Sequence, residues 1–113
     1  MKSPEQIVQE QLEHYNNRNM ESYISLFADD VKFYNYATGA LTMEGVEACE
    51  SFYQNLFDQS PNLKSTITKR ITYGNVVIDH ESITGRMGSA IAVELVLIFE
   101  VKDEKICKVT VIK

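Results

Sequence analysis

The chain has 113 residues, of which 44% are apolar and 24% charged, and its 16 acidic and 11 basic residues give a net charge of -5. This length predicts one domain, residues 1–113, with a single hydrophobic core. The acidic balance argues against a general nucleic-acid binder, which needs a basic surface. The longest apolar run, 95–99, is far too short to span a membrane.

The first residues of the chain and its two cysteines indicate in which cellular compartment the protein is expected. The first ten residues are polar and charged where a signal peptide needs an apolar stretch, so we expect a cytoplasmic protein. Cys49 and Cys107 lie far apart in the sequence, and no neighbouring Cys or His gives them a zinc spacing. We therefore expect both thiols to pack in the core, and we expect neither a metal nor a cofactor.

Three helices are predicted. The first begins after Ser3, which can cap it in a Ser-x-x-Gln box with proline at the first helical position, and apolar spacing extends it to about Asn16. A short second helix follows Asn19 and stops near Ala28. The third begins at Gly45 and ends at the proline of a Ser-Pro-Asn sequence.

Two short and four long strands are predicted. The short strands, 31–36 and 41–44, flank a turn at 37–40. The long strands are 63–73, 76–84, 90–102 and 106–112. Their short connections favour an antiparallel meander, and strands longer than the common five or six residues must twist and coil. We therefore expect an α+β fold in which helices cover the concave face of a curved sheet and leave an apolar pocket.

The alternation of residues in the 90–102 strand predicts its two faces. Its odd positions from Val93 to Val101 are uniformly apolar, so we assign them to the inner face. The even positions combine Val96 and Ile98 with two glutamates, which gives the outer face an apolar centre. A homodimer packed sheet to sheet would cover that centre.

His80 is the candidate general base. Its neighbours Asp79 and Glu81 suit a solvated outer face, which would turn His80 towards the inside of the sheet. The reference pKa of histidine, about 6.5, is close to neutral, and burial favours the neutral form that a base requires. The alternative is a hydrogen-bonded histidine of the core without a chemical role.

Four sequence runs resemble the nuclear transport factor 2-like superfamily, in its SnoaL-like and ketosteroid-isomerase-like branch. They are ISLFADDV at 24–31, YATG at 36–39, SFYQNLF at 51–57 and VVIDHESITG at 76–85. The resemblance covers essentially the whole chain and implies a cone-like α+β barrel, in which a strongly curved antiparallel sheet wraps around the N-terminal helices and one small-molecule pocket. Members of this branch include isomerases, epoxide hydrolases, dehydratases, polyketide cyclases and non-catalytic, usually dimeric modules, so the fold alone does not imply an activity.

The resemblance also allows a test for ketosteroid isomerase chemistry, which uses an Asp base with a Tyr and a protonated Asp. The base position corresponds to Asn35, the tyrosine to about Gln11 and the protonated aspartate to a position near Leu97. An amide does not take up a proton near neutral pH, and leucine has no polar atom. We therefore do not expect a ketosteroid isomerase that works by this mechanism.

The pocket lining that the resemblance implies is mainly apolar. It comprises Gln11, Tyr15, Phe33, Asn35, Phe52, Ile78, His80, Leu97, Phe99 and Val109. The first hypothesis is an isomerase, hydrolase or cyclase-type enzyme that acts on a small hydrophobic molecule, with His80 as base and Asn35 and Gln11 as polarising donors. The alternative is a non-catalytic dimeric module that binds a ligand or a partner.

Overall fold

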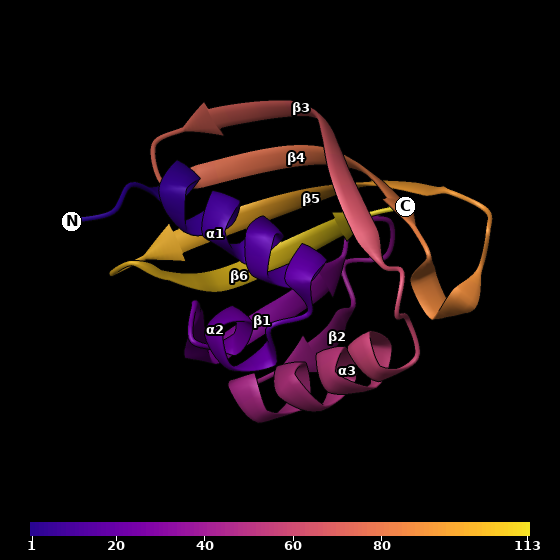
Figure 1. Ribbon diagram of the computed structural model, residues 1–113. Coiled ribbons are helices and arrows are strands. Elements are labelled where there is room, and N and C mark those ends of the chain that lie inside the picture. Colours follow the sequence, from indigo (N-terminus) through magenta and orange to yellow (C-terminus); the bar gives the residue numbers. More distant parts are fainter.

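The computed structural model describes all 113 residues (Figure 1). The elements follow in the order α1 (Pro4–Asn17), α2 (Met20–Ile24), β1 (Phe27–Asn35), β2 (Leu41–Glu44), α3 (Val46–Asp58), β3 (Lys64–Tyr73), β4 (Val76–Thr84), the 3-10 helix η1 (Arg86–Gly88), β5 (Val93–Lys102) and β6 (Lys105–Ile112). The capping box at Ser3 is present: its side chain accepts the Gln6 N–H at 3.2 Å, and its own N–H donates to the Gln6 side chain at 2.8 Å.

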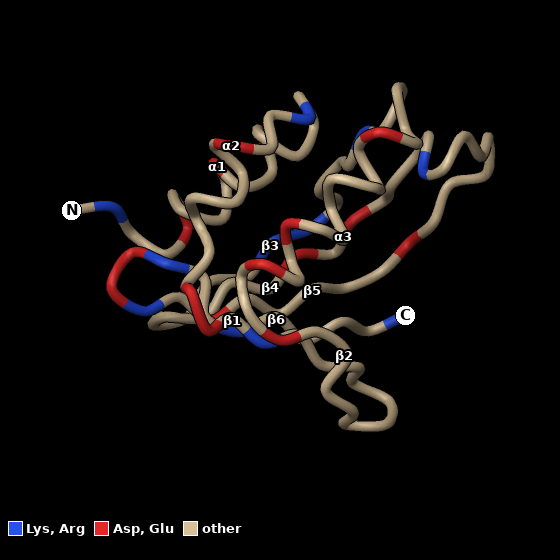
Figure 2. Tube along the Cα trace, turned by 90° about the horizontal axis from the view of Figure 1, so that it is seen from below, with Lys and Arg blue, Asp and Glu red and all other residues tan.

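The six strands form one open sheet in the order β2-β1-β6-β5-β4-β3, and the helices lie against one of its faces (Figures 1 and 2). The α+β fold class is confirmed. The expectation of a wholly antiparallel sheet is wrong at one pairing, because β1 runs parallel to β6. These strands lie at opposite ends of the chain, so no hairpin fixes their relative direction.

The same pairing extends β1 beyond its predicted start. Val31 was expected to begin the strand, whereas the structure begins it at Phe27, which pairs with Ile106. The backbone N–H of Ile106 donates to the carbonyl of Leu26 at 2.8 Å. A register shift between Phe27 and Lys32 accommodates the two aspartates in between. Tertiary pairing, rather than local sequence preference, therefore draws this segment into the sheet.

The hydrophobic core lies between the sheet and the helices. Tyr23 of α2 lies at the centre of this core and is 1% exposed. Its ring centroid lies 4.9 Å from that of Tyr53, 5.1 Å from that of Phe27 and 5.5 Å from that of Phe57. The aromatic side chains thus join α2, α3 and β1 into one packed cluster.

The distribution of basic residues and the lengths of the helices bear on two possible partners, nucleic acids and membranes. Lysines and arginines are scattered along the chain rather than gathered in one patch (Figure 2). No helix of the fold is both long enough and apolar enough to cross a membrane.

The pairing of β4 with β5 decides which residues of β4 face the helices. Asp79 lies opposite Leu97, His80 opposite Val96 and Glu81 opposite Leu95. The odd positions of β5 do form its inner face, so the odd positions of β4 share that face. Asp79 is 0% exposed and Glu81 4% exposed. The prediction that these acids face outward and His80 inward is therefore wrong.

Candidate functional site

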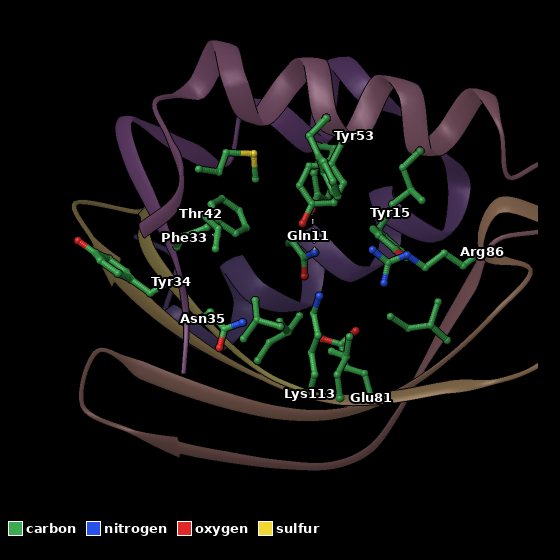
Figure 3. Close-up of a pocket in the computed structure, with 18 residues that line it drawn as sticks. Gln11, Tyr15, Phe33, Tyr34, Asn35, Thr42, Tyr53, Glu81, Arg86 and Lys113 are labelled. Carbon is green, nitrogen blue, oxygen red and sulfur yellow. Dashed lines mark hydrogen bonds between the residues drawn. The ribbon is translucent and has the colours of Figure 1, made fainter. Parts of the chain in front are cut away.

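A cavity of about 240 Å³ lies between the inner face of the sheet and the helices (Figure 3). Twelve of its 18 lining residues are hydrophobic. The lining comprises Gln11, Tyr15, Tyr23, Phe33, Tyr34, Asn35, Thr42, Met43, Phe52, Tyr53, Leu56, Glu81, Ile83, Arg86, Leu95, Leu97, Val111 and Lys113. The cavity is slightly smaller than the roughly 300–1,000 Å³ typical of ligand pockets, and it is mainly apolar as they are.

The structure places six of the ten expected lining residues at this cavity: Gln11, Tyr15, Phe33, Asn35, Phe52 and Leu97. Phe99 and Val109 do not line it. They face each other across the β5–β6 pair and are 2% and 1% exposed, because this end of the sheet is filled by the core. Ile78 shares the outer face with His80, so neither can reach the cavity.

His80 forms a pair with Glu94 on the outer face of the sheet. Its Nε2 lies 2.9 Å from Oε1 of Glu94, and the two side chains are 44% and 67% exposed. An imidazole in this position cannot act on a molecule held in the cavity. The structure therefore removes His80 as the candidate base.

Glu81 is the acid that does line the cavity. Its carboxylate accepts a hydrogen bond of 2.6 Å from Oγ of Ser65. The pKa of Glu81 is raised to about 7, mainly by burial and in smaller part by the negative charge of Asp79, while the Ser65 hydrogen bond and the charge of Arg70 act in the opposite direction. Glu81 can thus exist in both its protonated and ionised forms near neutral pH.

A buried ion pair lies beside Glu81. Arg70 of β3 donates from Nε to Oδ1 of Asp79 at 2.6 Å and from Nη2 to Oδ2 at 2.9 Å. Its Nη1 donates to the side-chain oxygen of Gln9 in α1 at 2.8 Å. Because both carboxylate oxygens of Asp79 are occupied, the pair supports the site and leaves Glu81 as the acid available to a ligand.

An irregularity in β3 brings these partners to one face. Ser65 and Arg70 have opposite parity in the sequence, yet Ser65 pairs with the inward Ile83 and Arg70 with the inward Asp79. The register shifts between Ile67 and Lys69, which reverses the alternation. Sequence reasoning missed Glu81 because the inward direction of its partner Ser65 and of the nearby Arg70 follows only from this register.

Several other polar groups of the cavity can donate hydrogen bonds. Burial raises the pKa of Tyr15 to about 12, despite the positive charge of Arg86, and raises that of Tyr53 well above its usual value. These phenols therefore keep their protons near neutral pH. The Asn35 side-chain oxygen accepts the backbone N–H groups of residues 37 and 38 at 2.9 and 3.4 Å, so its amide nitrogen remains for a ligand. Gln11 Nε2 lies 3.4 Å from the Tyr23 hydroxyl, a long contact.

The structure contains no group of three or more His, Cys, Asp or Glu side chains arranged to hold a metal ion.

Residues 8–109 match the sequence profile of the SnoaL-like domain family. The chain belongs to this family. No curated protein matches this SnoaL-like domain.

Three solved structures illustrate what the SnoaL-like domain is similar to. A cystatin-fold protein from Novosphingobium aromaticivorans has 21% identity and a TM-score of 0.89, with 100% of both chains covered. A Catenulispora acidiphila protein with a ketosteroid-isomerase-like fold, solved with trimethylamine, has 24% identity and a TM-score of 0.79, covering 99% of this chain and 87% of that one. A putative SnoaL-like polyketide cyclase from Jannaschia sp. has 15% identity and a TM-score of 0.78, covering 96% and 83%. These similarities support the fold, and the activity has to be inferred from the residues of the site.

Proposed function

We propose that this SnoaL-like domain binds a small, mainly apolar organic molecule and transfers a proton on it, with Glu81 as the acid–base group. One observation carries the proposal: Glu81 is the only acid in the lining of an apolar cavity, and its pKa is about 7. A general base or acid works best when its pKa is close to the working pH. A buried carboxyl group with a shifted pKa in a cavity is a typical candidate for this role.

The residues around Glu81 suit a cofactor-independent isomerase or lyase. The Glu81 carboxylate would take a proton from the carbon next to a carbonyl group, and the resulting carboxylic acid would return that proton to another atom of the same molecule. Negative charge that develops on the carbonyl oxygen would be stabilised by N–H donors such as the Asn35 and Gln11 amides. Neutral tyrosines around the cavity provide apolar surface and further O–H donors.

The proposal can be tested by solvent deuterium exchange. With a panel of small aryl ketones in D₂O, the wild type is expected to exchange the protons next to the carbonyl, as followed by NMR. Glu81→Gln should slow this exchange by roughly 10²–10⁴-fold, because the amide has no basic oxygen. Glu94→Gln, the matched change on the outer face, should retain the rate. Exchange by Glu81→Gln at the wild-type rate would contradict the proposal, and binding without exchange by the wild type would favour a non-catalytic module.

We also propose that the domain is a homodimer, formed through the outer face of the sheet. Ile78 lies opposite Ile98, and Val96 lies opposite Ile112, so four apolar side chains adjoin across β4, β5 and β6. All four are half-buried in the single chain. An apolar patch on the uncovered side of a sheet is typical of a protein–protein interface.

Val96→Glu is expected to convert such a dimer to a monomer, because the interface would have to bury an unpaired carboxylate. Sedimentation velocity measures the result directly. Ile91→Glu, a matched change at a side chain that is 76% exposed outside the sheet, should leave the dimer intact. A Val96→Glu variant that remains dimeric would show that the interface lies elsewhere.

The two cysteines support our proposal of a cytoplasmic location. Both are free thiols. Cys49 is 0% exposed, and burial raises its pKa to about 12, so it packs in the core as predicted. Cys107 is only half-buried, and its Sγ donates to the Glu100 carbonyl at 3.3 Å. Free thiols are typical of proteins in a reducing compartment.

A further inference from the structure

Arg86 is held at the cavity by a well-supported turn. It begins η1 directly after Gly85, whose φ is 74° and whose Cβ, if it had one, would lie 2.2 Å from the carbonyl oxygen of Asn62. The next residue, Met87, donates its backbone N–H to Oγ of the fully buried Ser60 at 2.8 Å. The turn therefore packs tightly against the segment that follows α3, which fixes the base of the Arg86 side chain.

The guanidinium of Arg86 has no acidic partner in the protein. The ion pairs of the structure are Lys2–Glu10, Arg70–Asp79, His80–Glu94 and Lys108–Glu100. No hydrogen bond engages the Arg86 side chain either, although it lines the cavity beside Tyr15 (Figure 3). A half-buried arginine without a carboxylate partner, directed into a cavity, leaves its donors for a bound molecule.

The local charge of the cavity is opposite to that of the whole chain. The chain carries a net charge of -5, yet the lining contains two cations, Arg86 and Lys113, and only one acid, Glu81. That acid is protonated in part near neutral pH, since its pKa is about 7. The side chains of the lining therefore carry a net positive charge, which favours an anion.

We propose that the natural ligand is a small amphipathic carboxylate whose anionic group is bound by Arg86. This inference rests on the proposed small-molecule function and adds the ligand class to it. A guanidinium can donate two parallel N–H bonds to a carboxylate, and such bonds are stronger than those between neutral groups. The apolar part of the ligand would lie along the aromatic wall formed by Tyr15 and Tyr53.

The position of Arg86 also gives the ligand an orientation. In Figure 3, Arg86 and Asn35 approach the cavity from opposite sides, and Glu81 lies between them. A carboxylate held by Arg86 would place the apolar body of the ligand beside Glu81 and its far end towards Asn35. The carboxylate is then the group that binds, and an atom further along the molecule is the one that gains or loses a proton.

Binding of a matched pair of probes tests this inference. Calorimetric titration with 3-phenylpropanoate and with neutral 3-phenylpropanamide, at about pH 6 and low salt, compares an anion with a neutral molecule of similar shape. The wild type is expected to bind the anion at least roughly tenfold more tightly, the factor that a charge-assisted hydrogen bond supplies. Arg86→Gln should remove this preference and leave amide binding unchanged, and Arg86→Lys should retain part of it. Lys69→Gln should behave as the wild type, because it removes an exposed cation on the outer face, where Lys69 lies opposite His80 in the β3–β4 register.

The outcomes separate the two proposals. Equal binding of both probes by the wild type would overturn the carboxylate inference and leave the small-molecule cavity in place. An Arg86→Gln variant that loses affinity for both probes alike would also overturn it, because the arginine would then have a structural role. Failure of both probes to bind to the wild type would count against the small-molecule function itself.

Discussion

Glu81→Gln is expected to stabilise the protein above pH 7 and to remove most of the dependence of its stability on pH between about 4.5 and 7. The pKa of Glu81 is about 7 in the folded protein, against 4.5 for the unperturbed group. Within this window the folded state holds the proton that the unfolded state releases, so the free energy of unfolding falls as pH rises. The loss is complete above the folded pKa and amounts to roughly 3 kcal/mol for a shift of this size.

Urea denaturation at several pH values measures this effect. The wild type should lose stability as pH rises through the window, whereas Glu81→Gln should not, since glutamine stays neutral and can still accept the Ser65 hydrogen bond. Glu94→Gln should show the wild-type profile, because its side chain is 67% exposed. Parallel pH profiles of wild type and Glu81→Gln would show that Glu81 ionises in the folded protein as it does in water. A gain in stability coupled to a loss of proton transfer is the pattern expected of a functional buried acid.

Arg70→Met is expected to destabilise the protein by about 3–5 kcal/mol, because it leaves Asp79 as a buried carboxylate without its cation. Asp79 is 0% exposed, and both of its oxygens accept hydrogen bonds from Arg70. The double variant Arg70→Met/Asp79→Leu should recover most of the loss, since apolar side chains of similar volume can replace a buried ion pair at little cost. Denaturant unfolding of the wild type, Arg70→Met, Asp79→Leu and the double variant forms a complete cycle.

The same variants report on Glu81. The charge of Arg70 lowers the pKa of Glu81 and that of Asp79 raises it. The pH at which proton transfer is half-maximal should therefore rise in Arg70→Met, whereas the double variant removes both influences. Additive losses of stability in the cycle would contradict the interpretation of Arg70 and Asp79 as one unit.

Local sequence patterns predicted the elements more successfully than their faces. The capping box at Ser3 and the 76–84 strand appear in the structure as expected, because hydrogen bonding and alternation act over a few residues. The odd face of β5 is also inward as predicted, because all five odd positions from Val93 to Val101 are apolar, whereas the even positions include two glutamates.

The face of β4 could not be predicted in the same way. The odd and the even positions of β4 both contain apolar residues, and the acids Asp79 and Glu81 favour an outward direction for the odd positions. Buried acids become acceptable only when partners elsewhere compensate them, here Arg70 and Ser65. Whether those partners point inward depends on a register shift that no local pattern in β3 announces.

The shift in β3 divides the strand into two halves with different tasks. Thr68 is the extra residue: no residue of β4 lies opposite it in the register. Its hydroxyl instead donates to the backbone carbonyl of His80 at 2.9 Å. The half before it supplies the hydroxyl that holds Glu81, and the half after it supplies the cation that neutralises Asp79. Moving the extra residue along the strand would exchange which side chains reach the interior while leaving every residue of β4 unchanged. An insertion or deletion in this edge strand would therefore change the polar groups that reach the cavity without any substitution in β4.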